Sequence, residues 1–179
     1  MSYREDLWAV AASQNGVVTI AEAEDAGVPA VEVRKLAARG ALRSHGLGVY
    51  THRGVPSTPL TEPAVAVALA GDGAFLHREA VFSLLGMGQF NPKRIRVGTR
   101  RRVRRALPEW VELEHRPGLP ETDLIRYEGV PSTTAQRALL DLRGRMPRER
   151  WEALSREAVL YGWLTEADAE SSEWADRPA

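Results

Sequence analysis

Cationic side chains are concentrated between residues 30 and 53 of this chain. The basic residues there are Arg34, Lys35, Arg39, Arg43 and Arg53. Glu32 is the one acidic residue of the segment, so its net charge is +4. Guanidinium and ammonium groups donate hydrogen bonds to phosphate oxygens, and one guanidinium can donate two bonds to a guanine edge. These residue types therefore suit contact with a nucleic-acid duplex.

The residues around these cations predict two short helices joined by a turn. Thr19 and Glu22 have the spacing of a capping box, which starts a helix from Ile20 to Ala26. Gly27-Val28-Pro29 ends it, since glycine permits a tight turn and proline favours the start of the next helix. That next helix should run from Ala30 to Arg39 and stop at Gly40.

Two short strands are expected directly after these helices. They span Ala41 to His45 and Gly48 to His52, and Gly46-Leu47-Gly48 joins them as a hairpin. Upstream, Tyr3 to Ser13 predicts a first helix. Three helices followed by a small hairpin predict a winged helix-turn-helix.

The helix from Ala30 to Arg39 should have two unlike faces. Its inward face is defined by helical spacing and consists of Val33, Leu36, Ala37 and Gly40. The other face is small and basic, as a helix must be to enter a major groove about 12 Å wide. We expect this face to read or line the groove through Val31, Arg34, Lys35, Ala38 and Arg39. From the hairpin, we expect the DNA backbone to be met by Arg43, His45 and Arg53.

Composition limits the class of protein. The chain has 179 residues, 44% of them hydrophobic, and 24 basic residues balance 24 acidic ones, so overall charge predicts no general affinity for nucleic acid. The absence of cysteine excludes disulfides and thiolate metal sites and agrees with a reducing compartment. No signal peptide and no apolar run of about 20 residues is visible. We therefore expect a cytoplasmic protein without a membrane association.

A break in the pattern at residues 53–59, which contain two prolines and a glycine, predicts a domain boundary. We expect a DNA-binding domain over residues 1–54, a linker over 55–60 and a second domain over 61–179. The second domain should contain helices over Thr61–Ala70, His77–Leu85, Arg148–Tyr161 and from Thr165, with strands over Arg94–Val97, Trp110–Glu114, Leu124–Tyr127 and Gly129–Pro131. A further helix, capped by Ser132-Thr133, should run through Leu142. A small sheet with helices before and after it predicts an α+β fold.

An arginine tract lies between two of these predicted strands. It consists of Arg100, Arg101, Arg102, Arg104 and Arg105. As a hairpin tip it could hold phosphates in a salt-dependent manner, bind an acidic partner, or remain a solvated loop. The charge is local, because residues 91–116 have a net charge of +6 and residues 117–179 a net charge of −4.

Two further titratable residues have structural explanations. His77 is expected to make a structural hydrogen bond at the start of a helix, and Asp141 to pair with Arg137 four residues earlier. No Gly-rich phosphate loop, HExxH pattern or nucleophile elbow is present. We therefore expect no catalytic residues, no metal site and no cofactor, and the chain is predicted not to be an enzyme.

The order of these motifs resembles the AbiEi family of antitoxins from type IV toxin–antitoxin systems. The resemblance rests on Gly48-Val49-Tyr50, Glu62-Pro63-Ala64, the segment from Leu76 to Ala80, Arg94 to Val97, and Gly129 to Leu142. The last segment is similar to the family's Gly-Ile-Pro-Val-Thr-x-x-x-Arg-Thr-Leu-Leu-Asp-Leu. The chain departs from the family at Leu76, where serine is common. The resemblance covers about residues 5 to 170.

The resemblance implies a role and two partners. The winged helix would bind inverted repeats in the promoter of the chain's own operon, and the second domain would help to neutralise a nucleotidyltransferase-like toxin. The expected function is thus a sequence-specific autorepressor and antitoxin. The alternatives are a protein-interaction module, in which the arginine tract docks a protein, and a winged-helix regulator without a toxin. Trp174 is a further candidate for partner contact. The sequence does not define the oligomeric state, and a monomer could bind adjacent half-sites cooperatively.

Overall fold

The computed structural model describes residues 2–172, and Trp174 lies outside this range. Its amino-terminal part, residues 2–54, contains three helices and three strands. In chain order these are α1 (Tyr3–Ser13), β1 (Val17–Thr19), α2 (Ile20–Asp25), α3 (Ala30–Ala38), β2 (Leu42–Gly46) and β3 (Val49–His52). The strands form an antiparallel sheet in the order β1-β3-β2. The expected helices and hairpin are thus confirmed to within one or two residues, whereas β1 was not predicted.

Local hydrogen bonds explain where these elements begin and turn. Thr19 and Glu22 form the predicted capping box of α2, and Ser2 and Glu5 form another at the start of α1. In the β2–β3 turn, Gly48 has a φ of 75°. A Cβ at that position would lie 3.1 Å from Ile20 Cγ1, so both backbone conformation and space favour glycine.

The interior of the amino-terminal part is a separate hydrophobic cluster. It contains Leu7, Ala11, Val18, Ala23, Val28, Val33, Leu42 and Tyr50. Val33 is fully buried and Leu36 and Ala37 pack against the cluster, as the helical spacing predicted. The prediction for Gly40 was wrong, because that residue is exposed. The helix ends at Ala38 and Gly40 has a φ of 79°, so the chain has already left the helical path.

The second part, residues 61–172, is a five-stranded sheet with helices on both sides. Its elements are α4 (Thr61–Ala70), β4 (Ala74–Leu76), α5 (Glu79–Leu84), β5 (Ile95–Thr99), β6 (Val111–His115), a 3-10 turn η1 (Glu121–Asp123), β7 (Leu124–Tyr127), β8 (Val130–Thr133), α6 (Ala135–Leu142), α7 (Arg148–Leu160) and α8 (Glu166–Ser171). The strand order is β6-β5-β4-β8-β7. The pairs β4–β5 and β7–β8 are antiparallel, and β4–β8 and β5–β6 are parallel. The chain is therefore an α+β protein, as expected.

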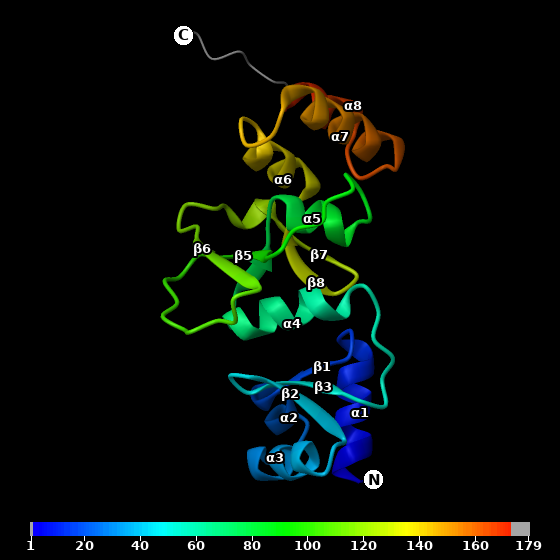
Figure 1. Cartoon of the computed structure of the whole chain (residues 1–179), viewed down its shortest axis with the longest axis vertical. Helices are drawn as coiled ribbons and strands as arrows, with labels where there is room; N and C mark the ends of the chain where they lie inside the picture. Colours follow the sequence, from blue (N-terminus) through cyan, green and yellow to red (C-terminus); the bar gives the residue numbers. More distant parts are fainter. Residues whose placement is uncertain (1, 173–179) are drawn as a thin grey trace.

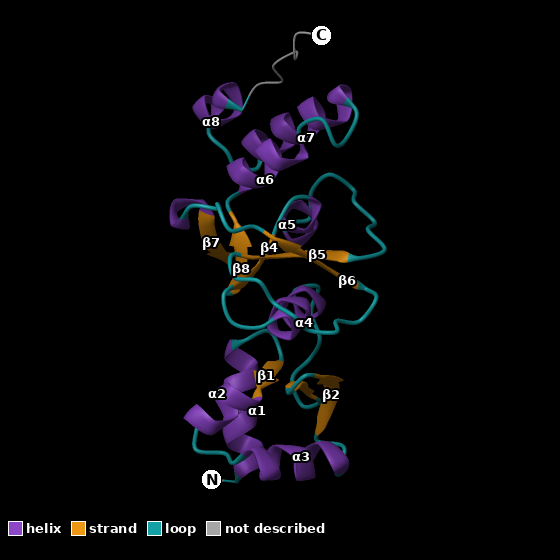
Figure 2. Ribbon diagram, turned by 90° about the vertical axis from the view of Figure 1, so that its left-hand side faces the viewer, coloured by secondary structure: helices purple, strands orange, loops and turns teal. Residues whose placement is uncertain are grey.

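The elements are stacked along the length of the molecule. Helix α4 lies between the amino-terminal part and the five-stranded sheet, while α5 and α6 lie on the opposite side of that sheet (Figure 1). Helices α7 and α8 lie beyond them, so α3 and α8 are near opposite ends (Figure 2). Val17 and Val49 belong to the same hydrophobic cluster as the buried face of α4. The two parts therefore share an apolar contact through α4.

The structure corrects two predictions in the second part. Strands β5 and β6 are parallel, with Ile95 beside Val111, so the arginine tract is not a hairpin tip. The connection between two parallel strands must return to the end of the sheet at which the first strand began, and residues 100–110 make that crossover. The helix expected from His77 begins at Glu79, because the unpredicted strand β4 runs up to Leu76.

Candidate nucleic-acid interface

The outer face of α3 is free of packing contacts with the protein core. All five residues assigned to this face are exposed, namely Val31, Arg34, Lys35, Ala38 and Arg39. Val31 is 52% exposed despite its apolar side chain. The opposite face is fixed by buried Val33. With nine residues the helix is about 13 Å long, which suits a helix that enters a groove of DNA.

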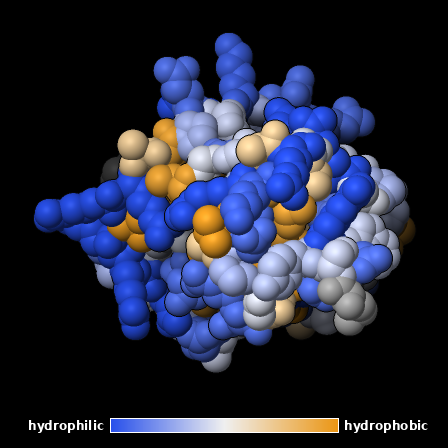
Figure 3. Space-filling model, turned by 90° about the horizontal axis from the view of Figure 1, so that it is seen from below, coloured by the Kyte–Doolittle hydropathy of each residue, from blue (hydrophilic) through white to orange (hydrophobic). Residues whose placement is uncertain are grey.

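The position of α3 makes this face accessible. The helix lies at the end of the molecule farthest from α7 and α8 (Figure 1). Seen from that end, the surface is mainly hydrophilic with small apolar areas between the polar side chains (Figure 3). A duplex could therefore approach α3 without displacing another element.

The basic side chains of α3 make few and weak contacts with the rest of the protein. Lys35 Nζ lies 2.7 Å from Glu32 Oε1, three residues earlier on the same exposed helix. Such surface pairs contribute about 0–1 kcal/mol, so a phosphate can compete for Lys35. Arg34 and Arg39 have no ion pair with any residue between 2 and 172. Their guanidinium groups can therefore bind a ligand without breaking internal contacts.

The three candidate residues in and next to the hairpin differ in how exposed their side chains are. Arg43 on β2 and Arg53 after β3 are exposed. His45 is half-buried, and its Nε2 lies 2.9 Å from Thr51 Oγ1. Burial, and then the charge of Arg43, lower the pKa of His45 below its ordinary value of 6.5. His45 is thus mainly neutral at pH 7 and can contact a phosphate by a hydrogen bond rather than as a cation.

The arginine tract makes one contact at each end and none in its middle within the described residues. Arg100 forms an ion pair with Glu121, and Arg105 Nη1 donates a hydrogen bond to the Leu69 carbonyl oxygen at 3.3 Å. The remaining arginines are Arg101, Arg102 and Arg104, which are exposed. Within the described part of the chain they have no hydrogen-bond or ion-pair partner.

A second charged cluster lies where the sheet meets α5 and α6, and sequence reasoning largely missed it. Its basic members are Arg78, Arg96, Arg116 and Arg137, and its acidic members are Glu79, Glu112, Glu114, Asp123 and Asp141. The expected pair of Arg137 and Asp141 is confirmed at 2.8 Å, and Arg116 binds the other oxygen of Asp141 at 2.8 Å. The alternation of Glu112 and Glu114 along β6 was the available signal, since both must face one side of the sheet.

The chemistry of this cluster is structural. Burial acts to raise the pKa of Asp141, but hydrogen bonds from Arg116 and Arg137 outweigh it and lower that pKa. A carboxylate held in this way is a poor general base at neutral pH. His77 is fully buried, and Arg116 Nη1 lies 3.4 Å from its Nδ1, which agrees with the expected structural contact. The acidic and basic side chains thus neutralise one another.

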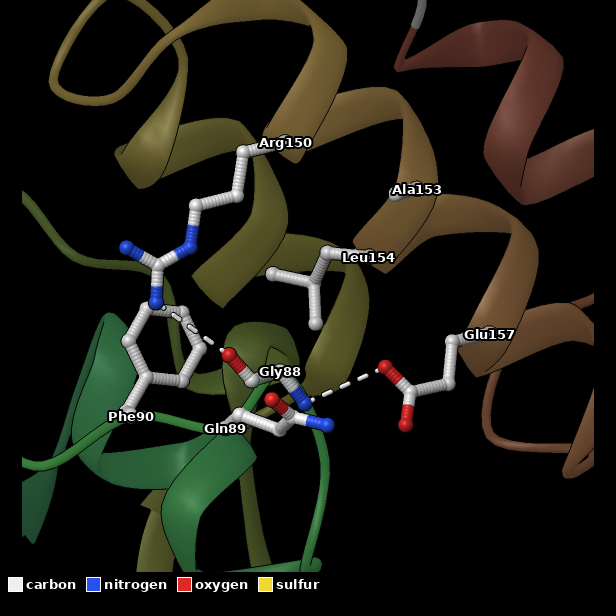
Figure 4. Close-up of a pocket in the computed structure, with 7 residues that line it drawn as sticks. All are labelled: Gly88, Gln89, Phe90, Arg150, Ala153, Leu154 and Glu157. Carbon is white, nitrogen blue, oxygen red and sulfur yellow. Dashed lines mark hydrogen bonds between the residues drawn. The ribbon is translucent and has the colours of Figure 1, made fainter.

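A hollow of about 330 Å³ beside α7 has the same structural character. Figure 4 shows Gly88 held between Arg150 and Glu157. Arg150 Nη2 donates to the Gly88 carbonyl oxygen at 3.2 Å, and the Gly88 N–H donates to Glu157 Oε2 at 3.1 Å. Arg150 also lies 4.8 Å from the centre of the Phe90 ring. These polar groups already bind one another. They connect α7 to the loop before β5, so we assign them a structural role.

Two general properties of the described residues bear on function. Between residues 2 and 172, no helix has both the length and the apolar character needed to cross a membrane. Over the same range, no group of three or more His, Asp and Glu side chains is placed to hold a metal ion.

Comparison with known proteins gives a likeness of fold. No protein-family model matches the chain, and no curated protein matches it in sequence. Among solved structures, the chain is similar to one described as the RV2827C protein from Mycobacterium tuberculosis, with a TM-score of 0.50 and 17% sequence identity. The likeness covers 95% of this chain and 80% of that one. At this identity it concerns the fold alone.

Proposed function

We propose that this chain is a sequence-specific DNA-binding transcriptional repressor that works in the cytoplasm. The observation that supports this function is the outer face of α3, which is basic, exposed and free of core contacts. Arg34 and Arg39 are suited to base edges or phosphates, and Val31 and Ala38 let the helix approach closely. The proposal assigns phosphate contacts to Arg43 and Arg53 and a hydrogen bond to His45.

The order of elements supports a winged helix-turn-helix as the binding module. Helices α2 and α3 are joined by a short turn, and the β2–β3 hairpin follows α3 directly. In such modules the second helix of the pair enters the major groove. In this proposal α3 is that helix and the hairpin is the wing.

Binding to the DNA upstream of the chain's own gene tests this function. Arg34→Ala should lower discrimination between that DNA and unrelated duplexes by about 1–3 kcal/mol, because one bidentate contact to guanine is lost. Arg43→Ala should weaken binding to all duplexes about equally and flatten the salt dependence by about one unit. Gel shifts at several salt concentrations measure both effects.

Arg156→Ala is the matched control for these variants. It removes the same charge from an exposed position on α7, at the opposite end of the molecule (Figure 1). Its binding should equal that of the wild type. If Arg34→Ala and Arg43→Ala bind every duplex as the wild type does, α3 and the hairpin are not the DNA-binding surface.

We further propose that the repressor is the antitoxin of a type IV pair and counteracts a nucleotidyltransferase-like toxin. The resemblance of Gly129 to Leu142 to the AbiEi motif supports this narrower role. Exposed apolar side chains at the end of α7 also offer a surface for a protein partner, with Leu160 80%, Tyr161 65% and Trp163 40% exposed. The toxin is expected to be encoded next to this chain.

Growth assays with that neighbouring gene test the antitoxin role. Expression of the toxin alone should stop growth, and co-expression of this chain should restore it. Arg34→Ala should still restore growth when both genes are expressed from unrelated promoters, since neutralisation would then not need DNA binding. A neighbouring gene product that is harmless alone would leave a regulator without a toxin.

A further inference from the structure

The carboxyl-terminal end of the arginine tract, Arg105, lies close to the hairpin although the two are about 55 residues apart in the sequence. A cleft of about 500 Å³ is lined by Leu47 and Gly48 from the hairpin turn and by Arg105 from the tract. In Figure 1 the β5–β6 loop and the tip of the β2–β3 hairpin lie on the same side of the molecule, near the end of α4. The fold thus places the tract beside the proposed wing.

The loop is held in a way that directs its free cations outward. Arg105 bonds to the Leu69 carbonyl oxygen in the last turn of α4, where a cation is favourable. Its guanidinium also packs against Gly71, where an added Cβ would lie 3.0 Å from Arg105 Cζ. At the other end, Arg100 forms a surface ion pair with Glu121. Between these two contacts, the side chains of Arg101, Arg102 and Arg104 are exposed.

We propose that Arg101, Arg102 and Arg104 form a second DNA-backbone contact next to the wing, so that the duplex bound by α3 extends onto the second part of the protein. This inference rests on the proposed DNA-binding function. Phosphates are the favoured ligands because three cations on one loop match a row of evenly spaced anions. The acidic residues that line the adjoining cleft are Glu22 and Asp72. Contacts of this kind add affinity and register without reading sequence.

The salt dependence of binding measures this contact. Each neutralised phosphate contributes about 0.9 to the slope of log affinity against log salt. The triple variant Arg101→Ala/Arg102→Ala/Arg104→Ala should therefore lower the slope by roughly 2.7. Between 50 and 200 mM salt, wild-type affinity should fall roughly 40-fold more than that of the variant. The corresponding triple lysine variant should retain the wild-type slope, because it keeps the charges.

Affinities for shortened operator duplexes show where along the DNA the arginine tract binds. Removing about one helical turn, 10 base pairs, from the side beyond the wing should weaken the wild type but not the triple alanine variant. The matched control is Lys93→Ala/Arg94→Ala/Arg156→Ala, which removes three exposed charges elsewhere and should behave as the wild type on every duplex.

The outcomes separate this inference from the function on which it rests. If the triple alanine variant keeps the wild-type slope and loses affinity on trimmed DNA as the wild type does, the tract does not touch DNA and an acidic protein partner becomes the better explanation. Loss of specificity in Arg34→Ala would in that case still support the repressor. If the wild type binds no duplex, both proposals are overturned.

Discussion

At the scale of single residues, His77 is the clearest case of a group whose surroundings determine its chemistry. It is fully buried beside Arg78 and Arg116, and its Nε2 has no hydrogen-bond partner within the described residues. Burial, and then the charges of Arg78 and Arg116, lower its pKa to about 3. His77 is therefore neutral in the folded protein over the whole physiological range of pH.

This lowered pKa predicts a loss of stability in mild acid. The unfolded chain binds a proton near pH 6.5 and the folded protein only near pH 3, so stability is complete above pH 6.5 and is lost as the pH falls through this window. Between pH 7 and pH 5 the contribution of His77 should fall by about 2 kcal/mol. Urea unfolding at both values measures the change in the free energy of unfolding.

The variant His77→Gln should show a correspondingly smaller difference between the two pH values, because glutamine does not titrate. His115→Gln, at an exposed histidine, is the control and should keep the wild-type difference. An equal loss of stability in wild type and His77→Gln would contradict the assignment of this pH dependence to His77.

At the scale of elements, Gly98 shows how two strands are fitted together. Phe75 of β4 and Gly98 of β5 are partners across the sheet, and a Cβ at Gly98 would lie 2.4 Å from Phe75 Cε2. The phenyl ring thus occupies the space that a side chain would need. Gly98→Ala should destabilise the protein by roughly 1–3 kcal/mol, because the ring must leave its place.

Thermal unfolding of Gly98→Ala and Gly118→Ala gives this comparison directly. Gly118 has no atom within 4 Å of an added Cβ, so alanine there should be nearly neutral. A melting temperature of Gly98→Ala equal to that of Gly118→Ala would show that the ring adapts without cost.

The sequence predicted elements best where local interactions determine them. The capping box of Thr19 and Glu22 and the apolar spacing around Val33 are contained in a few neighbouring residues, so α2 and α3 could be located. Strands β1 and β4 have three residues each, too few for an alternating pattern to be visible. The parallel pairing of β5 and β6 depends on contacts across the sheet, which is why the arginine tract was misplaced.

One part of the candidate site could likewise be predicted from local sequence, and the other part could not. The exposed face of α3 follows from helical periodicity, and all its residues were named from sequence. The nearness of the arginine tract to the hairpin depends on the tertiary fold, through Arg105, Leu69 and the groove beside Gly48. No local pattern could have predicted it.

At the scale of the whole molecule, the apolar contact through α4 predicts cooperative unfolding of the two parts. Val17 and Val49 share one cluster with α4, and Asn15 Nδ2 donates to the Glu128 carbonyl oxygen at 3.0 Å. We expect fluorotryptophan NMR signals of Trp8 and Trp151, one in each part, to report the same urea midpoint.

Val49→Ala should lower both midpoints together, with a loss of roughly 1–3 kcal/mol in the free energy of unfolding. Ala153→Gly, at an exposed position on α7, is a control that should keep the two midpoints coincident. Two separated midpoints in the wild type would show that the parts unfold independently.

If the proposed repressor and antitoxin roles hold, the stacked arrangement of elements affects how DNA and a protein partner can bind together. Helices α3 and α7 are at opposite ends of the molecule (Figure 1), and Tyr161 and Trp163 follow α7 directly in the sequence. A protein seated on Tyr161 and Trp163 would therefore leave the cationic end unobstructed. In the proposed role, one copy of the protein could bind the toxin at one end while it stays bound to DNA at the other.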